Sequence, residues 1–157
     1  MTNAAIRESF YTLQPWMPWA QEMPSLEKSE SNCRRAWAQF LLREDMTLRI
    51  FLKSTGELIG STGLHAPDWK VRKFMIGYWI GKRHEGNGYA QETVRAVANF
   101  AIETLKARRL EIWVDPRNAK SVRVAEAAGF QLESVQRNHG VDMNGNLCDQ
   151  MMYVRIM

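Results

Sequence analysis

The chain has 157 residues, of which 45% are hydrophobic and 24% are charged, and these proportions are typical of a folded globular protein. They exclude a disordered chain, and the lack of an apolar run of about 18 residues excludes a membrane-spanning helix. The net charge of +4 suits an anionic ligand or an acidic partner, but the basic runs 70–73 and 106–109 are too short for a nucleic-acid-binding stripe.

The first quarter of the chain reads as two helices separated by an ordered loop. A short helix is expected over 4–13, and the proline- and tryptophan-rich segment 14–19 then excludes helix, because proline lacks a backbone donor. Ser25 is a suitable N-cap for a second helix that runs to Arg43. Its apolar residues recur at helical spacing: Ala36, Trp37, Phe40 and Leu41.

Strand signals follow the second helix. Segment 47–52 is rich in β-forming residues, a turn is expected at 54–57, and 58–64 reads as the returning strand. Segment 74–80 is apolar on both faces, which predicts a strand at the centre of the sheet.

The periodicity then changes to that of an amphipathic helix. After Gly88, apolar residues from Val94 to Leu105 recur at intervals of three and four. A strand is expected over 110–114, and Asp115-Pro116 ends it. Asn118 or a neighbour caps a short helix through Ala128, where Gly129 fits the left-handed residue that follows a helix.

The C-terminal segment is predicted to form a hairpin, with strands over 132–141 and 147–156 and an Asn144-Gly145 turn. The order of elements is an antiparallel meander, a strand–helix–strand crossover and this hairpin. The sequence therefore predicts one mixed α/β domain that spans residues 1–157.

The stretch 80–90 carries the clearest chemical signal. A central strand runs into Arg83-His84-Glu85-Gly86-Asn87-Gly88, and a helix starts directly afterwards. Glycines at the entrance of a helix let the backbone approach a ligand closely. The unpaired amides of the first turn and the helix dipole then favour an anion, with phosphate the best match.

Three kinds of phosphate loop can be compared with this stretch. A Walker loop needs Gly-Lys-Ser/Thr, where this chain has Gly88-Tyr89-Ala90. A dinucleotide fingerprint needs a third glycine, where this chain has Gln91. Arg83, Gly86 and Gly88 match the third pattern, Arg/Gln-x-x-Gly-x-Gly/Ala, which predicts a pyrophosphate loop. On this match alone, a helix start with flexible glycines is an equal alternative.

The neighbouring motifs decide between these alternatives. Together with the loop they resemble the GNAT acetyltransferases, and more narrowly the RimJ/RimL-type N-acetyltransferases that modify ribosomal-protein N-termini or related amines. The resemblance covers the chain from about Ile6 to its end. The motifs that carry it are Trp16-Met17-Pro18-Trp19, Gly56-Glu57-Leu58-Ile59-Gly60, Gly63-Leu64-His65, Ile76-Gly77-Tyr78-Trp79-Ile80, Asp115-Pro116-x-Asn118-x-x-Ser121, Gly129-Phe130, and Leu132-Glu133-Ser134 leading to Asp149.

The resemblance implies the GNAT fold, with splayed central strands, and acetyl-CoA as the co-substrate. The family's pyrophosphate rests on loop amides, which correspond here to Arg83, His84, Glu85, Gly86, Asn87, Gly88, Tyr89, Ala90 and Gln91. The pantetheine arm of the cofactor pairs with the end of the central strand, here Tyr78, Trp79 and Ile80. Asn118 matches an asparagine whose side chain meets this arm.

The same resemblance suggests how an amine would attack the thioester directly. A backbone N–H near Trp79 or Ile80 is the expected oxyanion donor. Many family members carry a tyrosine as the acid, but Ala125 stands at that position. RimJ/RimL-type members carry a serine in Asn-x-x-Ser instead, which makes Ser121 the predicted acid for the departing thiolate. A purely structural role for Ser121 in capping the helix is the alternative.

The general base is less obvious. Related proteins carry glutamate where this chain has Met75, or near position 140, where this chain has Gly140. His139 is our catalytic candidate, because a histidine can act as a base near neutral pH. The remaining candidates, which could also face the amine, are His65, Asp68 and Asp142. Deprotonation by water alone is the alternative to a base from the protein.

The family pattern also begins with a strand before the first helix, and this chain starts at about that helix. That strand would be an edge strand, so segment 48–52 is expected to have an unpaired edge. Another chain, as in a homodimer, could cover the edge; so could a rearranged N-terminus, or the edge could stay open.

The function predicted from these features is acetyl-CoA-dependent transfer of an acetyl group to a primary amine, with a ribosomal or other protein α-amine as the leading acceptor. Aromatic side chains at Trp16, Trp19, Trp37 and Tyr78 are candidates for the wall of the amine pocket. A small-molecule amine is the alternative acceptor, and a catalytically weak CoA-binding module is the alternative class. We expect a cytoplasmic protein with no metal, since the cysteines form no ligand pattern, and with no membrane or nucleic-acid partner.

Overall fold

The computed structural model describes residues 1–157 and contains one mixed sheet in the strand order β1-β2-β3-β4-β6-β5. The strands are β1 (Met46–Phe51), β2 (Leu58–Asp68), β3 (Lys73–Ile80), β4 (Arg109–Val114), β5 (Gln131–Val141) and β6 (Leu147–Ile156). Only the β3–β4 pair is parallel, and all other neighbouring strands are antiparallel. The predicted meander, crossover and hairpin are therefore confirmed.

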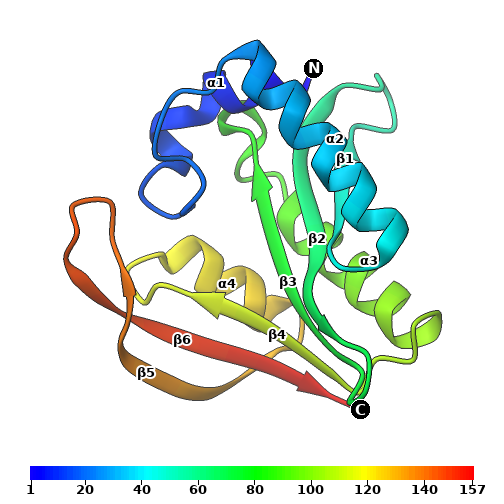
Figure 1. Ribbon diagram of the computed structural model, residues 1–157. Coiled ribbons are helices and arrows are strands. Elements are labelled where there is room, and N and C mark those ends of the chain that lie inside the picture. Colours follow the sequence, from blue (N-terminus) through cyan, green and yellow to red (C-terminus); the bar gives the residue numbers. More distant parts are fainter.

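Helices cover both faces of the sheet (Figure 1). They are α1 (Thr2–Leu13), α2 (Leu26–Leu42), α3 (Tyr89–Glu103) and α4 (Ala119–Ala127), with a short 3₁₀ turn η1 (Lys82–His84) before α3. The main hydrophobic core lies between the sheet and α3 and α4, where Phe74, Leu110 and Val94 are fully buried. A smaller cluster joins α1 to β3 through Phe10, Leu13 and Trp79, with Ala20.

The predicted helix signals are found where expected. Ser25 caps α2, because its hydroxyl accepts a hydrogen bond from Lys28 N–H at 3.0 Å. Asn118 caps α4 in the same way through Ser121 N–H at 3.1 Å. Gly129 follows α4 with φ +86°, in the left-handed region that glycine adopts readily.

One feature of the sheet differs from the sequence prediction, and a second was not predicted. β2 continues beyond Leu64 to Asp68, because the pairing with β3 skips Ala66 and Pro67 and resumes between Asp68 and Lys73. A proline that cannot donate is tolerated at such an irregularity. In addition, β6 lies between β4 and β5, so the second strand of the hairpin joins the rest of the sheet.

The parallel strands β3 and β4 pair only at their beginnings. Lys73, Phe74 and Met75 are opposite Arg109, Leu110 and Glu111, and the pairing stops there. Beyond Met75 the two strands diverge, and Figure 1 shows the resulting gap in the sheet. This is the splay that the family resemblance implies, and its backbone groups have no neighbouring strand to bond.

Strand β1 is an edge strand that pairs with β2 alone, and α2 packs near it. No segment of the chain forms a strand on its outer edge, so a rearranged N-terminal strand does not cover it. No helix of the structure combines the length and the apolar character needed to cross a bilayer.

Candidate functional site

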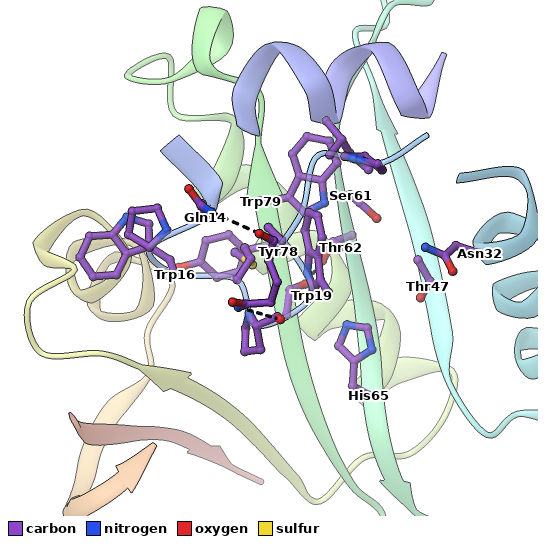
Figure 2. A pocket seen from close by; sticks show the side chains of 18 of the residues that line it. Gln14, Trp16, Trp19, Asn32, Thr47, Ser61, Thr62, His65, Tyr78 and Trp79 are labelled. Atoms are coloured by element: carbon purple, nitrogen blue, oxygen red, sulfur yellow. Dashed lines mark hydrogen bonds between the residues drawn. The ribbon is translucent and has the colours of Figure 1, made fainter. Parts of the chain in front are cut away.

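A cavity of about 1170 Å³ lies beside the gap between β3 and β4. Its lining comes from α1 and the segment after it, from α2, from β1 to β4, from the start of α4 and from the β5–β6 hairpin. Figure 2 shows Trp16, Trp19 and Tyr78 gathered around β3, with His65 projecting from the neighbouring strand β2. The size is that of a ligand pocket, and aromatic side chains with a few polar groups are typical of such a lining.

The glycine loop before α3 presents a row of backbone donors. None of the N–H groups of residues 86–91 donates to a carbonyl or side chain of the protein, and the first internal bond runs from Glu92 N–H to Gly88 O. The side chain of Asn87 donates to the carbonyls of His84 and Glu85, both at 3.2 Å, and this braces the loop. Consecutive unpaired amides at a helix N-terminus make an anion site.

The two loop glycines are needed for their backbone conformation. Gly86 and Gly88 both have φ +80°, a value that side chains disfavour, and a Cβ at either position would meet no atom within 4 Å. The space beside both glycines is therefore open, which leaves room for a ligand.

The cationic side chains of this region have carboxylate partners. Arg83 binds Glu8, with Nη2 2.9 Å from Oε2, and it also approaches Glu57 at 3.4 Å. Lys120 of α4 binds Glu85 at 2.6 Å and so ties α4 to the loop. The guanidinium of Arg83 is thus directed at α1 and β2, and the backbone amides supply the donors that the loop offers to an anion.

The end of β3 directs donors into the gap. Gly81 N–H donates to Ile59 O of β2 at 2.7 Å. Because successive N–H groups alternate along a strand, Trp79 N–H also faces β2, whereas the N–H groups of Tyr78 and Ile80 face the side that β4 has left. Of the two predicted oxyanion donors, Ile80 is therefore the one that faces the gap.

Ser121 and Asn118 both line the cavity from the first turn of α4. Asn118 Oδ1 serves as the helix cap, so the structural role weighed for Ser121 is filled by Asn118. The Tyr78 hydroxyl donates to the Ser121 carbonyl at 3.3 Å, and this bond joins β3 to α4 across the gap. Both predicted residues of α4 are thus brought to the diverging end of β3.

Burial raises the pKa of Tyr78 from its ordinary value near 10 to about 12, although the hydrogen bond to Ser121 acts in the opposite direction. A raised pKa means that the folded state favours the neutral phenol. The contribution of the neutral phenol to the free energy of unfolding is fully present below about pH 10 and is lost as the pH rises towards about 12.

Urea unfolding between pH 9 and 12 should therefore show a free energy of unfolding that declines with pH, and the decline should be smaller in Tyr78→Phe. An identical decline in the wild type and in Tyr78→Phe would contradict the raised pKa of Tyr78.

The candidate bases lie in different surroundings. His65 and Asp142 line the cavity, whereas Asp68 lies at the end of β2 and accepts from Lys70 and Val71 N–H groups. His139 is exposed on β5 and stacks on Trp113 with ring centroids 4.8 Å apart, so its side chain does not contribute to the lining. The catalytic role of His139 stays a prediction.

One polar contact in the cavity was not anticipated from the sequence. Asp45, which precedes β1, lies 2.7 Å from His65 Nδ1. The two residues are 20 positions apart, and only the pairing of β1 with β2 brings them together.

Three of the four aromatic candidates line the cavity: Trp16, Trp19 and Tyr78. The prediction that Trp37 could line the pocket is wrong, because Trp37 lies on the outer side of α2, where it is 63% exposed and stacked on Phe40.

Comparison with known proteins agrees with this architecture. The model of the acetyltransferase (GNAT) domain family matches residues 3–131, which is most of the chain. The chain belongs to the GNAT acetyltransferase family. A relative in Bacillus subtilis (strain 168), the "Probable N-acetyltransferase YjcK", is 39% identical over 103 residues, which cover 65% of this chain and 56% of the relative. This chain spans 56% to 63% of the length of this relative and two others from Bacillus.

Solved structures share this fold over nearly the full length of this chain. RimL, a ribosomal L7/L12 α-N-protein acetyltransferase in complex with coenzyme A, superposes with a TM-score of 0.93 at 22% identity and covers 99% of this chain and 86% of its own. Spermidine N-acetyltransferase from Vibrio cholerae, in complex with CoA and spermine, has a TM-score of 0.81 at 17% identity. The match covers 98% of this chain and 87% of the spermidine N-acetyltransferase chain. The predicted fold class is therefore confirmed.

Proposed function

We propose that this GNAT protein transfers the acetyl group of acetyl-CoA to a primary amine. The observation that carries the proposal is the row of unpaired N–H groups at residues 86–91, which stands at the N-terminus of α3 beside the β3–β4 gap. An anion site next to an open strand edge suits a ligand with a pyrophosphate and an amide-containing arm. The match to the GNAT family supports the same ligand.

The residues present fit acetyl-CoA as follows. Loop residues 83–91 would hold the pyrophosphate through their backbone, and the Tyr78–Ile80 edge would pair with the pantetheine arm. The Asn118 amide nitrogen would donate to the same arm, since only its oxygen is used in the cap. Bound there, acetyl-CoA supplies an activated acyl group with a thiolate as the leaving group.

The protein has three tasks in this reaction. It must accept a proton from the ammonium form of the substrate, stabilise an oxyanion and protonate the thiolate. Ile80 N–H is the proposed oxyanion donor because it faces the gap. The Ser121 hydroxyl is the proposed acid because it lines the cavity on the opposite side of the gap from β2.

We further propose the α-amine of a peptide or protein as the leading acceptor, with a small polyamine-like amine as the second candidate. The first is supported by the similarity to RimL, and the second by the similarity to spermidine N-acetyltransferase. The wide cavity with its aromatic wall of Trp16, Trp19 and Tyr78 suits the chain of either acceptor.

The test is thiol release from acetyl-CoA with a panel of amines: peptides that begin with serine or alanine, the same peptides with blocked N-termini, and spermidine. We expect saturable CoA release with at least one free amine and none with the blocked peptides. Binding of acetyl-CoA without turnover on any amine would favour a CoA-binding module instead. Absence of binding would reject the proposed function.

Ser121→Ala should lower kcat by about 10- to 100-fold with little change in the Kd of acetyl-CoA, because the thiolate would lose its acid while the loop stays intact. The cap would be unaffected, since Asn118 supplies it. Steady-state kinetics combined with calorimetry separates the two effects. Unchanged kcat in Ser121→Ala would remove Ser121 from the mechanism.

A further inference from the structure

His65 and Thr47 are both hydrogen-bonded to the carboxylate of Asp45. Its Nδ1 lies 2.7 Å from Asp45 Oδ2, and the other oxygen of Asp45 accepts from Thr47 Oγ1 at 2.8 Å. An ionised carboxylate can only accept hydrogen bonds, so beside it the neutral imidazole carries its proton on Nδ1 and keeps its lone pair on Nε2. The contact with Asp45 therefore favours the tautomer with a free lone pair on Nε2, which is the tautomer that a general base needs.

Two glycines make room for this imidazole. Gly63 of β2 and Gly77 of β3 are directly opposite each other in the sheet. A Cβ at Gly63 would come within 2.8 Å of His65 Nε2, and one at Gly77 within 2.9 Å. Neither glycine has a positive φ, so both are explained by space and not by backbone conformation. The ring thus lies along the glycine pair, and Nε2 reaches across β2 to β3.

This position puts Nε2 beside the start of the β3–β4 gap. Gly77 is adjacent to Tyr78, the first β3 residue whose N–H faces the side that β4 has left. Alternation along β3 places Gly77 and His65 on the α2 face of the sheet, whereas Tyr78 reaches α4 and Ser121 on the other face. Both faces contribute to one cavity, so an acid and a base can act from opposite sides of the gap.

Several of the other charged groups that line the cavity have hydrogen-bond partners of their own. On its own face, Arg49 of β1 is bonded to Ser61 Oγ at 2.8 Å and to Cys33 Sγ of α2 at 3.7 Å. Glu22 lines the cavity from the segment after α1, and Lys28 lines it from the first turn of α2. On the far side, hydrogen bonds from Asn146 N–H and other donors lower the pKa of Asp142, and Arg117 lowers that of Asp115, so both carboxylates are poor proton acceptors.

We propose that His65, oriented by Asp45, is the general base that deprotonates the acceptor amine, an inference that rests on the proposed acetyltransferase function. His65 Nε2 takes one proton from the ammonium group, and the freed lone pair forms the C–N bond to the acetyl carbon. The C–S bond then breaks, and the second amine proton goes to the thiolate by way of Ser121. His65 finally releases its proton to solvent, which leaves an N-acetyl amine and CoA thiol.

The kinetic test uses the full chain with the most active amine of the panel. His65→Ala should lower kcat/KM by about 100- to 1000-fold, the usual contribution of a general base. Asp45→Asn should lower it by about 10-fold or more, because the tautomer is no longer fixed. The hole beside Gly63 and Gly77 fits an imidazole ring, so added imidazole should partly restore His65→Ala.

His139→Asn is the competing variant. The proposal would be overturned by full activity in His65→Ala. It would also be overturned if His139→Asn lost an activity that imidazole restores, while His65→Ala stayed active. Long-range ¹H–¹⁵N spectra of the three histidines provide a readout without turnover. A bare Nε2 on His65 is expected in the wild type and a mixed tautomer in Asp45→Asn, whereas a protonated Nε2 in the neutral ring would also overturn it.

Failure of the base assignment and failure of the proposed function give different results. If the wild type turns over an amine and His65→Ala does so equally well, only the base is wrong. If the wild type neither binds acetyl-CoA nor turns over, the proposed function fails first. Calorimetric binding of acetyl-CoA to His65→Ala, expected within about 2-fold of the wild type, shows that the variant is folded and that its loss lies in the chemical step.

Discussion

Gly86→Glu should weaken acetyl-CoA binding by about 100-fold or more, which corresponds to about 2.7 kcal/mol. The substitution places a negative side chain among the unpaired amides of residues 86–91, where the pyrophosphate is proposed to lie. The added repulsion and the displaced charge-assisted hydrogen bonds both act against the ligand. Without ligand, a carboxylate at the N-terminus of α3 is electrostatically favourable, so the variant should remain folded. Isothermal titration calorimetry measures the effect.

Gly145→Glu is a matched control for this variant. Gly145 has φ +82°, close to the +80° of Gly86, and a Cβ at either position meets no atom within 4 Å. The backbone strain of about 1 kcal/mol is therefore common to both variants. Gly145 lies in the β5–β6 turn, outside the row of unpaired amides at residues 86–91, so acetyl-CoA should bind Gly145→Glu like the wild type. Equal weakening in the two variants would contradict a specific role for the loop.

Phe74→Ala should lower the free energy of unfolding by about 3–5 kcal/mol, a large share of the stability of a typical domain. Phe74 is fully buried in the core between β3 and α3, and its ring meets Trp69 edge-on at 5.1 Å between centroids. The substitution removes this contact and leaves a cavity where β3 begins its pairing with β4. Urea unfolding followed by circular dichroism gives the free-energy difference.

Phe100→Ala tests whether that loss comes from burial. Phe100 is on α3, but its side chain is 43% exposed. The same substitution there should change the free energy of unfolding by about 0.5 kcal/mol or less. A similar loss in the two variants would mean that the core described around Phe74 does not dominate the stability of the fold.

The sequence predicted most elements of the fold because their signals are local. Ser25 and Asn118 act as the expected N-caps, and Gly129 adopts the expected left-handed conformation. The insertion of β6 between β4 and β5 could not be predicted, since strand order depends on long-range pairing and not on periodicity. The extension of β2 past Pro67 also depends on a partner, because Asp68 pairs with Lys73 across an irregularity.

The candidate site likewise has a part that could be predicted from local sequence and a part that could not. The glycine loop was predictable because a strand, two glycines and a helix follow one another directly in the sequence. The contact between Asp45 and His65 was not, because it depends on the register of β1 against β2. The outward position of Trp37 was likewise hidden, since helical spacing gives the face of a helix but not the side that packs inwards.

The central claim is that the amides of the glycine loop hold the anionic part of acetyl-CoA. The most direct test is a titration of the ¹⁵N-labelled protein with coenzyme A, followed by ¹H–¹⁵N correlation spectra. We predict that the largest shifts occur at the N–H groups of residues 86–91, which have no partner within the protein, with further shifts at Tyr78 and Ile80. Saturable binding that leaves the signals of residues 86–91 unchanged would contradict the account.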